Sequence, residues 1–280
     1  MKSQSKKIII HFIGIGGIGM SAIAEVMHDL GYKVQGSDLF LSENTKRLKN
    51  KGIKIFINHH SKNIQNATTV VYSSAIKKNN VEIMSSKKLS IPLVSRADIL
   101  SELMKNKKSI AIAGSHGKTT TTSLIGNILD TAKFDPTIIN GGIINSYSKN
   151  NKLGNGEWLV AEADESDGSF LKLPHQISVI TNIDIEHLDY YVTKSKLINS
   201  FKSFILNLPF YGYSIVCVDN IYLKKIANKI KTRNIITYSI KNNSSDIYIK
   251  EIKNNSKTSF FSIVLNKKIN GYKGKYKFKI

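Results

Sequence analysis

An apolar run that ends in a glycine–lysine–threonine turn and continues into a helix is the most constraining feature of this chain. Residues 109–114 read Ser-Ile-Ala-Ile-Ala-Gly, residues 115–122 read Ser-His-Gly-Lys-Thr-Thr-Thr-Thr, and residues 123–129 have the composition of a helix. This order predicts a phosphate-binding loop, because the backbone N–H groups and the dipole at a helix N-terminus attract an anion. We expect Lys118 to reach terminal phosphates and the Thr119 hydroxyl to take a Mg²⁺ ion. The alternative is a glycine-rich turn without a ligand. The four consecutive threonines argue against this alternative, because threonine is a poor helix former.

Length and composition indicate an ordinary two-domain protein. The chain has 280 residues, of which 41% are hydrophobic, and a domain takes roughly 100–200 residues. No apolar run approaches the roughly 20 residues that a membrane span needs. Residues 1–7 are basic and residues 8–13 apolar, as in a signal peptide, but four glycines within residues 14–19 interrupt that pattern. We therefore predict a buried strand and a cytoplasmic protein, and the single cysteine, Cys217, excludes an internal disulfide framework and a cysteine metal cluster.

The formal net charge of +21 raises the question of a nucleic-acid or anionic-lipid partner. Arginine, the preferred residue for bidentate contacts to phosphates and bases, occurs only at positions 47, 96 and 233. The lysines are spread along the chain together with many Asn and Ile residues and form no local patch. We therefore expect neither a nucleic-acid partner nor a membrane partner.

The first hundred residues alternate between strand and helix patterns. The expected strands are residues 8–13, 33–38, 53–57, 69–74 and 91–94, and the expected helices are residues 20–30, 45–51, 81–88 and 96–104. This alternation predicts a doubly wound α/β domain with a parallel sheet. A polar hinge at residues 105–108 separates it from the part that contains the phosphate loop.

The remainder of the chain contains further strand patterns and, besides the helix at residues 123–129, another helix. We expect strands at residues 109–113, 136–139, 157–162, 177–182, 214–218 and 234–238, and a helix at residues 194–208. From residue 246 the apolar residues alternate as they do in a β-hairpin.

A second glycine loop follows the first expected strand. Gly14, Gly16 and Gly19 fit the pattern G-x-G-x-x-G between a strand and a helix, and Asp38 lies about 20 residues further on, where a ribose-binding acid lies in dinucleotide folds. The pattern requires only a close backbone approach to a pyrophosphate. A dinucleotide and another diphosphate ligand therefore both remain open.

Two polar groups follow later strands. Residues 161–167 read Ala-Glu-Ala-Asp-Glu-Ser-Asp, and clustered carboxylates repel one another unless a cation such as Mg²⁺ offsets them. The alternative is a solvated acidic turn. Residues 181–189 place His187 after a buried strand, where open α/β sheets bind ligands. That histidine is a metal ligand, a proton carrier or a structural residue.

Taken together, the motifs resemble those of the Mur ligase family. They occur in order as IGIGGIGMSAIAE (13–25), GSD (36–38), YSSAI (72–76), SRADILSELM (95–104), AGSHGKTTTT (113–122), NGG (140–142), EADESDGSF (162–170) and TNIDIEHLD (181–189). The resemblance implies an α/β fold with an N-terminal Rossmann-like, doubly wound, UDP-sugar-binding domain in residues 1–105. An incomplete P-loop-type, ATP-binding central domain follows in residues 106–280.

The resemblance also implies a reaction in peptidoglycan precursor synthesis. Within the family, the motifs are most similar to those of the member that uses ATP and Mg²⁺ to join L-alanine to the lactyl carboxylate of UDP-N-acetylmuramate. ATP phosphorylates that carboxylate, and the amine of L-alanine then attacks the acyl phosphate. Catalysis of this type depends mainly on positioning and charge neutralisation.

By this resemblance, Lys118, Glu162 and His187 carry the catalysis. Lys118 neutralises phosphate charge, Thr119 and Glu162 hold one Mg²⁺ ion, and His187 holds a second metal. ATP is wrapped by one continuous segment, namely Gly114, Ser115, His116, Gly117, Lys118, Thr119 and Thr120. The UDP-sugar site draws on several segments, namely Gly14, Gly16, Gly17, Gly19, Ser37, Asp38, Ser73, Ser74, Asp164, Glu165 and Ser166.

The chain is shorter than the three-domain pattern that the resemblance implies, and we expect the family's C-terminal domain to be absent from it. Either it is a fragment or the product of a split or decayed gene, or a separate chain supplies the missing domain. Alternatives are an inactive binder of UDP-sugar and nucleotide, a sister ligase that attaches a recycled peptide, a folylpolyglutamate-synthase-like enzyme and an NAD-dependent oxidoreductase. The sister ligase usually carries Cys where this chain has Gly17, which argues against it. The folylpolyglutamate-synthase-like enzyme and the oxidoreductase each leave one of the two glycine loops unexplained.

Overall fold

The computed structural model describes residues 8–144, 149–255, 258–269 and 271–279. Its contacts divide the chain into two compact units, the first comprising residues 1–108 with 119–162 and the second residues 109–118 with 163–280. This division does not coincide with the expected domain boundary between residues 105 and 106, which stays a prediction.

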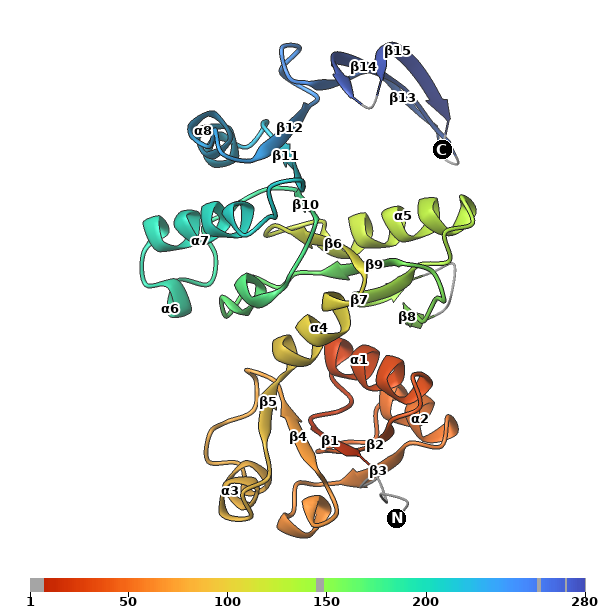
Figure 1. The fold of residues 1–280 in the computed structure, drawn as a ribbon, viewed down its shortest axis with the longest axis vertical. Coiled ribbons are helices and arrows are strands. Elements are labelled where there is room, and N and C mark those ends of the chain that lie inside the picture. Colours follow the sequence, from red (N-terminus) through yellow and green to blue (C-terminus); the bar gives the residue numbers. More distant parts are fainter. Residues whose placement is uncertain (1–7, 145–148, 256–257, 270, 280) are drawn as a thin grey trace, which may run out of the picture. The chain divides into compact units, whose positions relative to one another are not determined.

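The first unit contains a parallel five-stranded sheet (Figure 1). Its strand order is β3-β2-β1-β4-β5, and the strands span Ile9–Ile13 (β1), Lys33–Asp38 (β2), Lys54–Ile57 (β3), Thr69–Tyr72 (β4) and Leu93–Ser95 (β5). This order, with helices between successive strands, is that of a dinucleotide-type doubly wound fold. The predicted α/β architecture is therefore confirmed, although Ser73 and Ser74 follow β4 in a turn instead of extending it.

Helices connect these strands, namely α1 (Ile18–Asp29), α2 (Glu43–Asn50), α3 (Val81–Lys88) and α4 (Arg96–Lys105), together with the short helix η1 (Ser61–Ile64). Helix α1 contacts α2 and α4, whereas α3 contacts η1. Ile13, Val70 and Ile83 belong to a buried cluster that joins the sheet to η1 and α3. Helix α4 begins with a capping box, in which Ser95 and Asp98 exchange hydrogen bonds.

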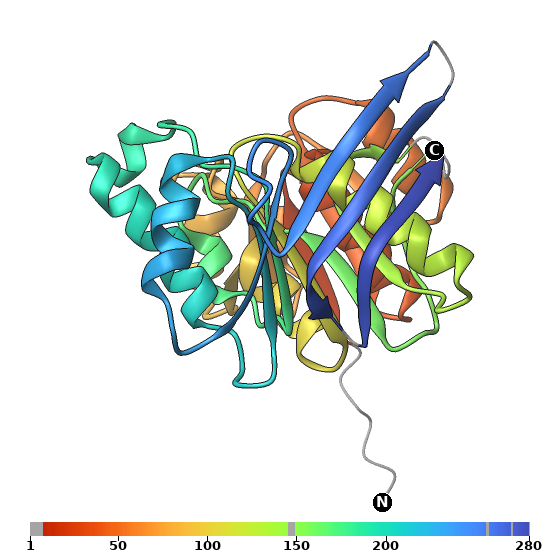
Figure 2. The same ribbon diagram turned by 90° about the horizontal axis from the view of Figure 1, so that it is seen from above.

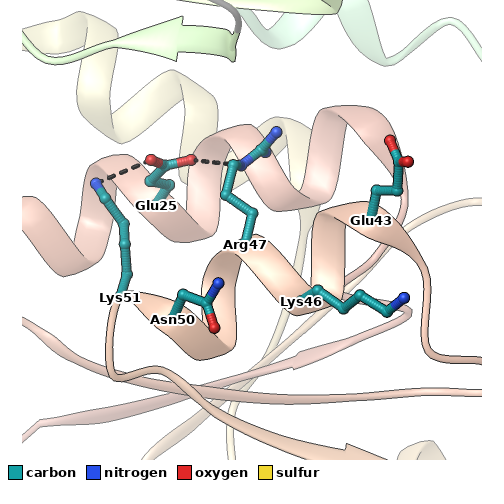
Figure 3. A pocket seen from close by; sticks show the side chains of 6 residues that line it. All are labelled: Glu25, Glu43, Lys46, Arg47, Asn50 and Lys51. Atoms are coloured by element: carbon teal, nitrogen blue, oxygen red, sulfur yellow. Dashed lines mark ion pairs between the residues drawn. The ribbon is translucent and has the colours of Figure 1, made fainter.

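A buried charge fixes α2 against α1 (Figure 3). The carboxylate of Glu25 on α1 lies 2.8 Å from Nζ of Lys51 and 3.3 Å from Nε of Arg47. Arg47 lies on α2, and Lys51 is the C-terminal cap of that helix. The surrounding groove of about 480 Å³ is also lined by Glu43, Lys46 and Asn50. Burial alone would lower the pKa of Lys51, but hydrogen bonds to Asp29 and Glu25 outweigh it and raise that pKa. Because Arg47 and Lys51 already have carboxylate partners, we interpret the groove as a structural contact between α1 and α2.

The first unit also contains β7 (Thr137–Ile144), β8 (Lys149–Lys152), β9 (Trp158–Glu162) and all but the first residue of α5 (Lys118–Thr131). Strand β7 pairs in parallel with β9 and antiparallel with β8. Gly126 lets α5 approach β7 closely, because an added Cβ would lie 2.5 Å from Cδ1 of Ile138. Asn151 of β8 donates a hydrogen bond to the carbonyl of Ala22 in α1.

The second unit contains a parallel group of neighbouring strands in the order β6 (Lys108–Ala113), β10 (Ile177–Ile180), β11 (Tyr213–Cys217) and β12 (Asn234–Ser239). Strand β13 (Ile247–Asn254) pairs in parallel with β12 and antiparallel with β14 (Ser259–Ile269), which pairs with β15 (Tyr272–Lys279). Figure 2 shows these last three strands side by side. The predicted hairpin region is therefore confirmed.

Helices of the second unit are η2 (Ser169–Lys172), α6 (Leu188–Tyr191), α7 (Lys194–Leu206) and α8 (Ile221–Lys229). Phe170, Phe201 and Phe204 are buried together, with ring centroids 4.9–5.4 Å apart for the contacts of Phe170. Helix α7 was expected from the sequence, whereas α6, α8 and β8 were not.

Candidate active site

The N-terminal glycine loop is held by the end of β2. The amides of Gly14 and Ile15 both donate to the carbonyl of Ser37, at 2.8 and 3.0 Å, and Gly14 has a φ of +73°. The amide of Gly16 donates to Oδ2 of Asp38 at 2.7 Å. A Cβ on Gly16 would lie 2.9 Å from the same oxygen, so this position requires glycine. The structure thus brings Gly14, Gly16 and Asp38 together as the sequence predicted, with Asp38 bonded to the loop backbone.

The turn after β4 lies against this loop. Ser73 is half-buried and Ser74 exposed. Cδ1 of Ile76, in the same turn, lies 3.1 Å from the position of a Cβ on Gly14. Gly17 caps the N-terminus of α1, and Gly19 in its first turn lies beside Arg96 of α4.

Ser37 lies inside the unit, on a buried polar network. Its side chain is fully buried, and its hydroxyl donates to Oε2 of Glu82 at 2.5 Å and lies 2.9 Å from Nδ1 of His59. The same carboxylate accepts hydrogen bonds from Asn63 at 2.7 Å and from the amide of His60 at 3.2 Å. The hydroxyl of Ser37 therefore already has partners within the protein.

Glu82 is the centre of this network. Nε2 of His11, also fully buried, lies 3.2 Å from Oε2 of Glu82. Burial alone would raise the pKa of Glu82, but the hydrogen bond and charge of His11, with Ser37 and Asn63, outweigh it and hold that pKa below its ordinary value. The sequence analysis did not single out Glu82 or His11, because no local motif marks a partner that lies 71 residues away.

The second glycine loop, between β6 and α5, is also restrained by tertiary contacts. Gly114 has a φ of +134°, and a Cβ there would lie 2.1 Å from Oγ1 of Thr181. The amide of His116 donates to Oδ1 of Asn182 at 2.9 Å, and the hydroxyl of Thr181 donates to the carbonyl of His116 at 2.6 Å. The segment after β10, predicted to be functional, therefore supports the second glycine loop.

Further contacts involve exposed parts of the loop. The hydroxyl of Ser115 accepts from the amide of Asp184 at 2.9 Å. Nε2 of His116 lies 3.0 Å from Oδ2 of Asp184 and 3.3 Å from Oε1 of Glu186. Gly117, with a φ of +80°, directly precedes α5.

Lys118 lies at the start of α5 and turns back toward its own loop. Nζ donates to the carbonyl of Gly114 at 2.7 Å and lies 3.0 Å from Oε2 of Glu165. Burial raises the pKa of Glu165 above its ordinary value, although the charge of Lys118 opposes that shift. Glu165 is predicted from the sequence to line the UDP-sugar site, and in the structure its carboxylate contacts Lys118.

In the first unit, the beginning of α5 meets the middle of β7 and the end of β9. The hydroxyl of Thr119 donates to Oε2 of Glu162 at 3.0 Å, and the amide of Gly141 donates to the same oxygen at 2.8 Å. Asn140 donates to the carbonyl of Thr119 at 3.1 Å and to the hydroxyl of Ser123 at 2.7 Å. The predicted pair of Thr119 and Glu162 is thus brought together by contacts over 43 residues.

Asn140 is a residue to which the sequence analysis gave no role. It fixes the first turn of α5 through both Thr119 and Ser123, so it holds Thr119 in place. The motif Asn-Gly-Gly was the available signal, since Gly141 also needs its missing side chain: a Cβ there would lie 2.6 Å from Oε2 of Glu162.

His187 belongs to the second unit and precedes α6. Its φ of +56° places it in the left-handed region, which non-glycine residues seldom adopt. Tyr191, at the other end of α6, donates a hydrogen bond from its hydroxyl to the carbonyl of Glu165. Asp164 accepts a hydrogen bond from the amide of Ser166, as in a tight Asx turn.

Within the described residues, there is no group of three or more His, Cys, Asp or Glu side chains that could hold a metal ion. In the same part of the chain, no helix combines the length and the apolar character needed to cross a membrane.

Comparison with known proteins gives two matches to family models. Residues 9–108 match the Mur ligase family, catalytic domain, and residues 112–279 match the Mur ligase middle domain. The second match alone spans more than half of the chain.

Individual relatives agree with the family matches. The chain is 50% identical over 252 residues to a UDP-N-acetylmuramate–L-alanine ligase of Xanthobacter autotrophicus, which covers 90% of this chain and 53% of the relative. It is 51% identical over 257 residues to the ligase of the same name from Rickettsia bellii, covering 92% and 54%. The chain thus spans about half the length of these curated relatives.

A solved structure has the same fold. The UDP-N-acetylmuramate-alanine ligase of Thermotoga maritima matches with a TM-score of 0.85 and 26% identity, covering 98% of this chain and 60% of that one. With both glycine loops in place and two matching family models, the chain belongs to the Mur ligase family.

Proposed function

We propose that this chain is the UDP-N-acetylmuramate-binding and ATP-binding part of an enzyme that joins L-alanine to UDP-N-acetylmuramate. The observation that carries the proposal is the pair of Thr119 and Glu162, 3.0 Å apart at the N-terminal turn of α5 and directly after Lys118. A helix N-terminus with a lysine and a hydroxyl suits a nucleotide phosphate, and a carboxylate hydrogen-bonded to that hydroxyl suits the magnesium ion of the nucleotide. The names of the relatives support the choice of substrates.

The reaction would proceed in two steps. A carboxylate oxygen of the lactyl group attacks the γ-phosphorus of ATP, and ADP leaves. The amine nitrogen of L-alanine then attacks the acyl carbon, loses a proton, and inorganic phosphate leaves as the amide forms. In the first step Lys118 would stabilise charge on the β- and γ-phosphates, because it is the cation of the loop.

Mg²⁺ fits the oxygen donors of Thr119 and Glu162. Both oxygens have fixed positions, because Asn140 holds the backbone of Thr119 and the amide of Gly141 holds the carboxylate. A bound Mg²⁺ would supply charge neutralisation at the phosphates. His187 would hold a second metal, and its left-handed backbone, with a φ of +56°, is of the strained kind that is found at functional sites.

The N-terminal glycine loop would take the diphosphate of the UDP-sugar. At Gly16 the loop backbone lies too close to its neighbours in the protein for a side chain. Gly17 caps the N-terminus of α1, and the backbone N–H groups at that end of the helix would attract the diphosphate. Asp38, Ser73 and Ser74 would border this ligand, and Asp164 and Ser166 would border the sugar acid. The two functional domains would be residues 1–105 and residues 106–280. The location would be cytoplasmic, with which a single cysteine is in keeping.

Phosphate release and ligand binding by this 280-residue chain test the proposal. With ATP, Mg²⁺, UDP-N-acetylmuramate and L-alanine, phosphate release should depend on all components. Lys118→Ala should reduce it at least about 100-fold, because phosphate charge is then uncompensated, and should leave UDP-N-acetylmuramate affinity unchanged by calorimetry. Lys105→Ala, which removes an exposed lysine paired with Glu102, is the control and should behave as the wild type.

Each outcome separates the candidate functions. Loss of both ligands in Lys118→Ala would contradict the assignment of two separate sites. Binding of both ligands by the wild type without phosphate release would favour the second candidate, a binder of UDP-sugar and nucleotide.

A further inference from the structure

The ammonium group of Lys118 has no donor left for a phosphate. Nζ donates to the carbonyls of Gly114 at 2.7 Å and Ser115 at 3.4 Å and to Oε1 of Glu165 at 3.1 Å. An ammonium has three N–H donors, so these three acceptors use all of them. A nucleotide phosphate must therefore replace at least one of them.

Glu165 is the charged competitor among the three. Its side chain is only 1% exposed and that of Lys118 13%, so the ion pair is largely removed from water. An ion pair of low exposure is not weakened by solvent as a surface pair is, and separating it leaves a buried charge without a partner. A phosphate that approaches Nζ would also approach a carboxylate of the same sign.

The backbone of Glu165 is held by its surroundings. Its carbonyl accepts hydrogen bonds from the amide of Gly168 at 3.1 Å and from the hydroxyl of Tyr191, which is buried. The contact therefore joins two fixed segments, the turn after β9 and the start of α5. A flexible surface pair would have no such anchoring.

We propose that Glu165 is a positioning residue that holds Lys118 turned back in the nucleotide-free protein and competes with the nucleotide phosphates for its ammonium group. The inference rests on the proposed nucleotide site. It gives Glu165 a function in setting nucleotide affinity, in place of the contact to UDP-sugar expected from the sequence. Only a ligand whose phosphate reaches Nζ displaces the carboxylate. The ion pair therefore lowers the affinity for nucleotides.

Nucleotide affinity of Glu165→Gln is the direct test. Titration of the full chain with a fluorescent ATP analogue and Mg²⁺ should give a Kd about tenfold lower than that of the wild type, a coupling of the size usual for contacting charges. Glu157→Gln is the matched control, because it removes the same charge from an exposed pair with Lys108 and should leave the Kd unchanged. An unchanged or higher Kd in Glu165→Gln overturns the proposal.

A double-mutant comparison separates competition from simple repulsion. In a Lys118→Met background, adding Glu165→Gln should no longer tighten binding, because the competed-for ammonium is gone. If the same tightening persists without Lys118, Glu165 repels phosphate directly and the proposal is wrong. Glu165→Asp, which keeps the charge on a shorter side chain, should tighten binding less than Glu165→Gln and guards against a folding defect.

A measurement without nucleotide separates this inference from the proposed function. Reductive methylation followed by peptide mass spectrometry should label Lys118 slowly in the wild type and several-fold faster in Glu165→Gln. Equal labelling, with normal nucleotide binding by the wild type, overturns the inference alone. Faster labelling in a protein that binds no nucleotide overturns the proposed function and the competition, and leaves only the ion pair.

Discussion

At the scale of single residues, Glu162 has the most sharply defined environment among the proposed metal ligands. One of its oxygens, Oε2, receives hydrogen bonds from both Thr119 and Gly141. These two donors orient the carboxylate. A change of charge at this position should therefore affect the ion more than the local structure.

Glu162→Gln should raise the Mg²⁺ concentration needed for half-maximal phosphate release about tenfold, because a neutral amide binds Mg²⁺ more weakly than a carboxylate. The amide oxygen can still accept the hydrogen bond from Gly141, so thermal stability should change little. A Mg²⁺ titration of phosphate release measures the effect. Glu102→Gln, at an exposed pair with Lys105, serves as the control, and an unchanged Mg²⁺ midpoint in Glu162→Gln would remove Glu162 from the metal site.

At the scale of elements, the second glycine loop depends on the segment that follows β10. Thr181 and Asn182 hydrogen-bond to the loop backbone, and the space for a side chain at Gly114 is filled by Thr181. The loop conformation is thus set by its neighbour as much as by its own glycines.

Gly114→Ala should destabilise the protein by about 3 kcal/mol or more, since the new Cβ combines a strained φ with a collision. Gly31→Ala is the matched control, because Gly31 also has a positive φ, +90°, but nothing lies within 4 Å of its Cβ position. Denaturant unfolding compares the two variants. Equal losses of unfolding free energy would show that the contact with Thr181 adds nothing to the backbone strain.

The elements themselves were largely predictable. Apolar runs and glycine positions gave the strands and helices of the N-terminal sheet, and a capping box marks the start of α4. Helix α8 was missed although Asn220 caps it and Leu223 and Ile226 lie on its buried side. Helix α6 has a single turn that begins after the unusual backbone of His187, which no local pattern indicates.

At the scale of the whole molecule, each compact unit joins parts that are distant in the chain. The first unit combines residues 1–108 with residues 119–162, and α1 contacts both β7 and β8. Within the same unit, Glu82 of α3 joins β1, β2 and the segment around η1. The stability of the sheet that carries the glycine loop should therefore depend on this one buried carboxylate.

Glu82→Gln should lower the unfolding free energy at pH 7 by about 2 kcal/mol, because a buried ionic acceptor of several hydrogen bonds is lost. The pKa of Glu82 is lower in the folded protein than its ordinary value of 4.5. The stabilisation is thus present above pH 4.5 and is lost as the pH falls through the folded-state pKa. The difference between wild type and Glu82→Gln should consequently shrink below about pH 4.5. Denaturant unfolding at several pH values measures it, and a difference that stays constant with pH would contradict the role of the carboxylate.

Features that depend on neighbouring residues could be predicted from the amino-acid sequence. Glycines between an apolar run and a helix fixed the position of both loops, and Lys118 and Thr119 follow the second loop directly. The alternation of strands and helices determined the α/β class, since it depends on local hydrophobic periodicity.

Tertiary structure alone decided which partners the polar side chains have. Ser37 and Glu165 both belong to motifs that suggested a UDP-sugar site. The hydroxyl of Ser37 donates a hydrogen bond to Glu82, 45 residues away, and the carboxylate of Glu165 accepts one from Lys118, 47 residues away. Such contacts depend on strand order and on the close approach of segments that are distant in the chain. No local pattern encodes them, because the energy of a buried charge is set by what folding brings next to it.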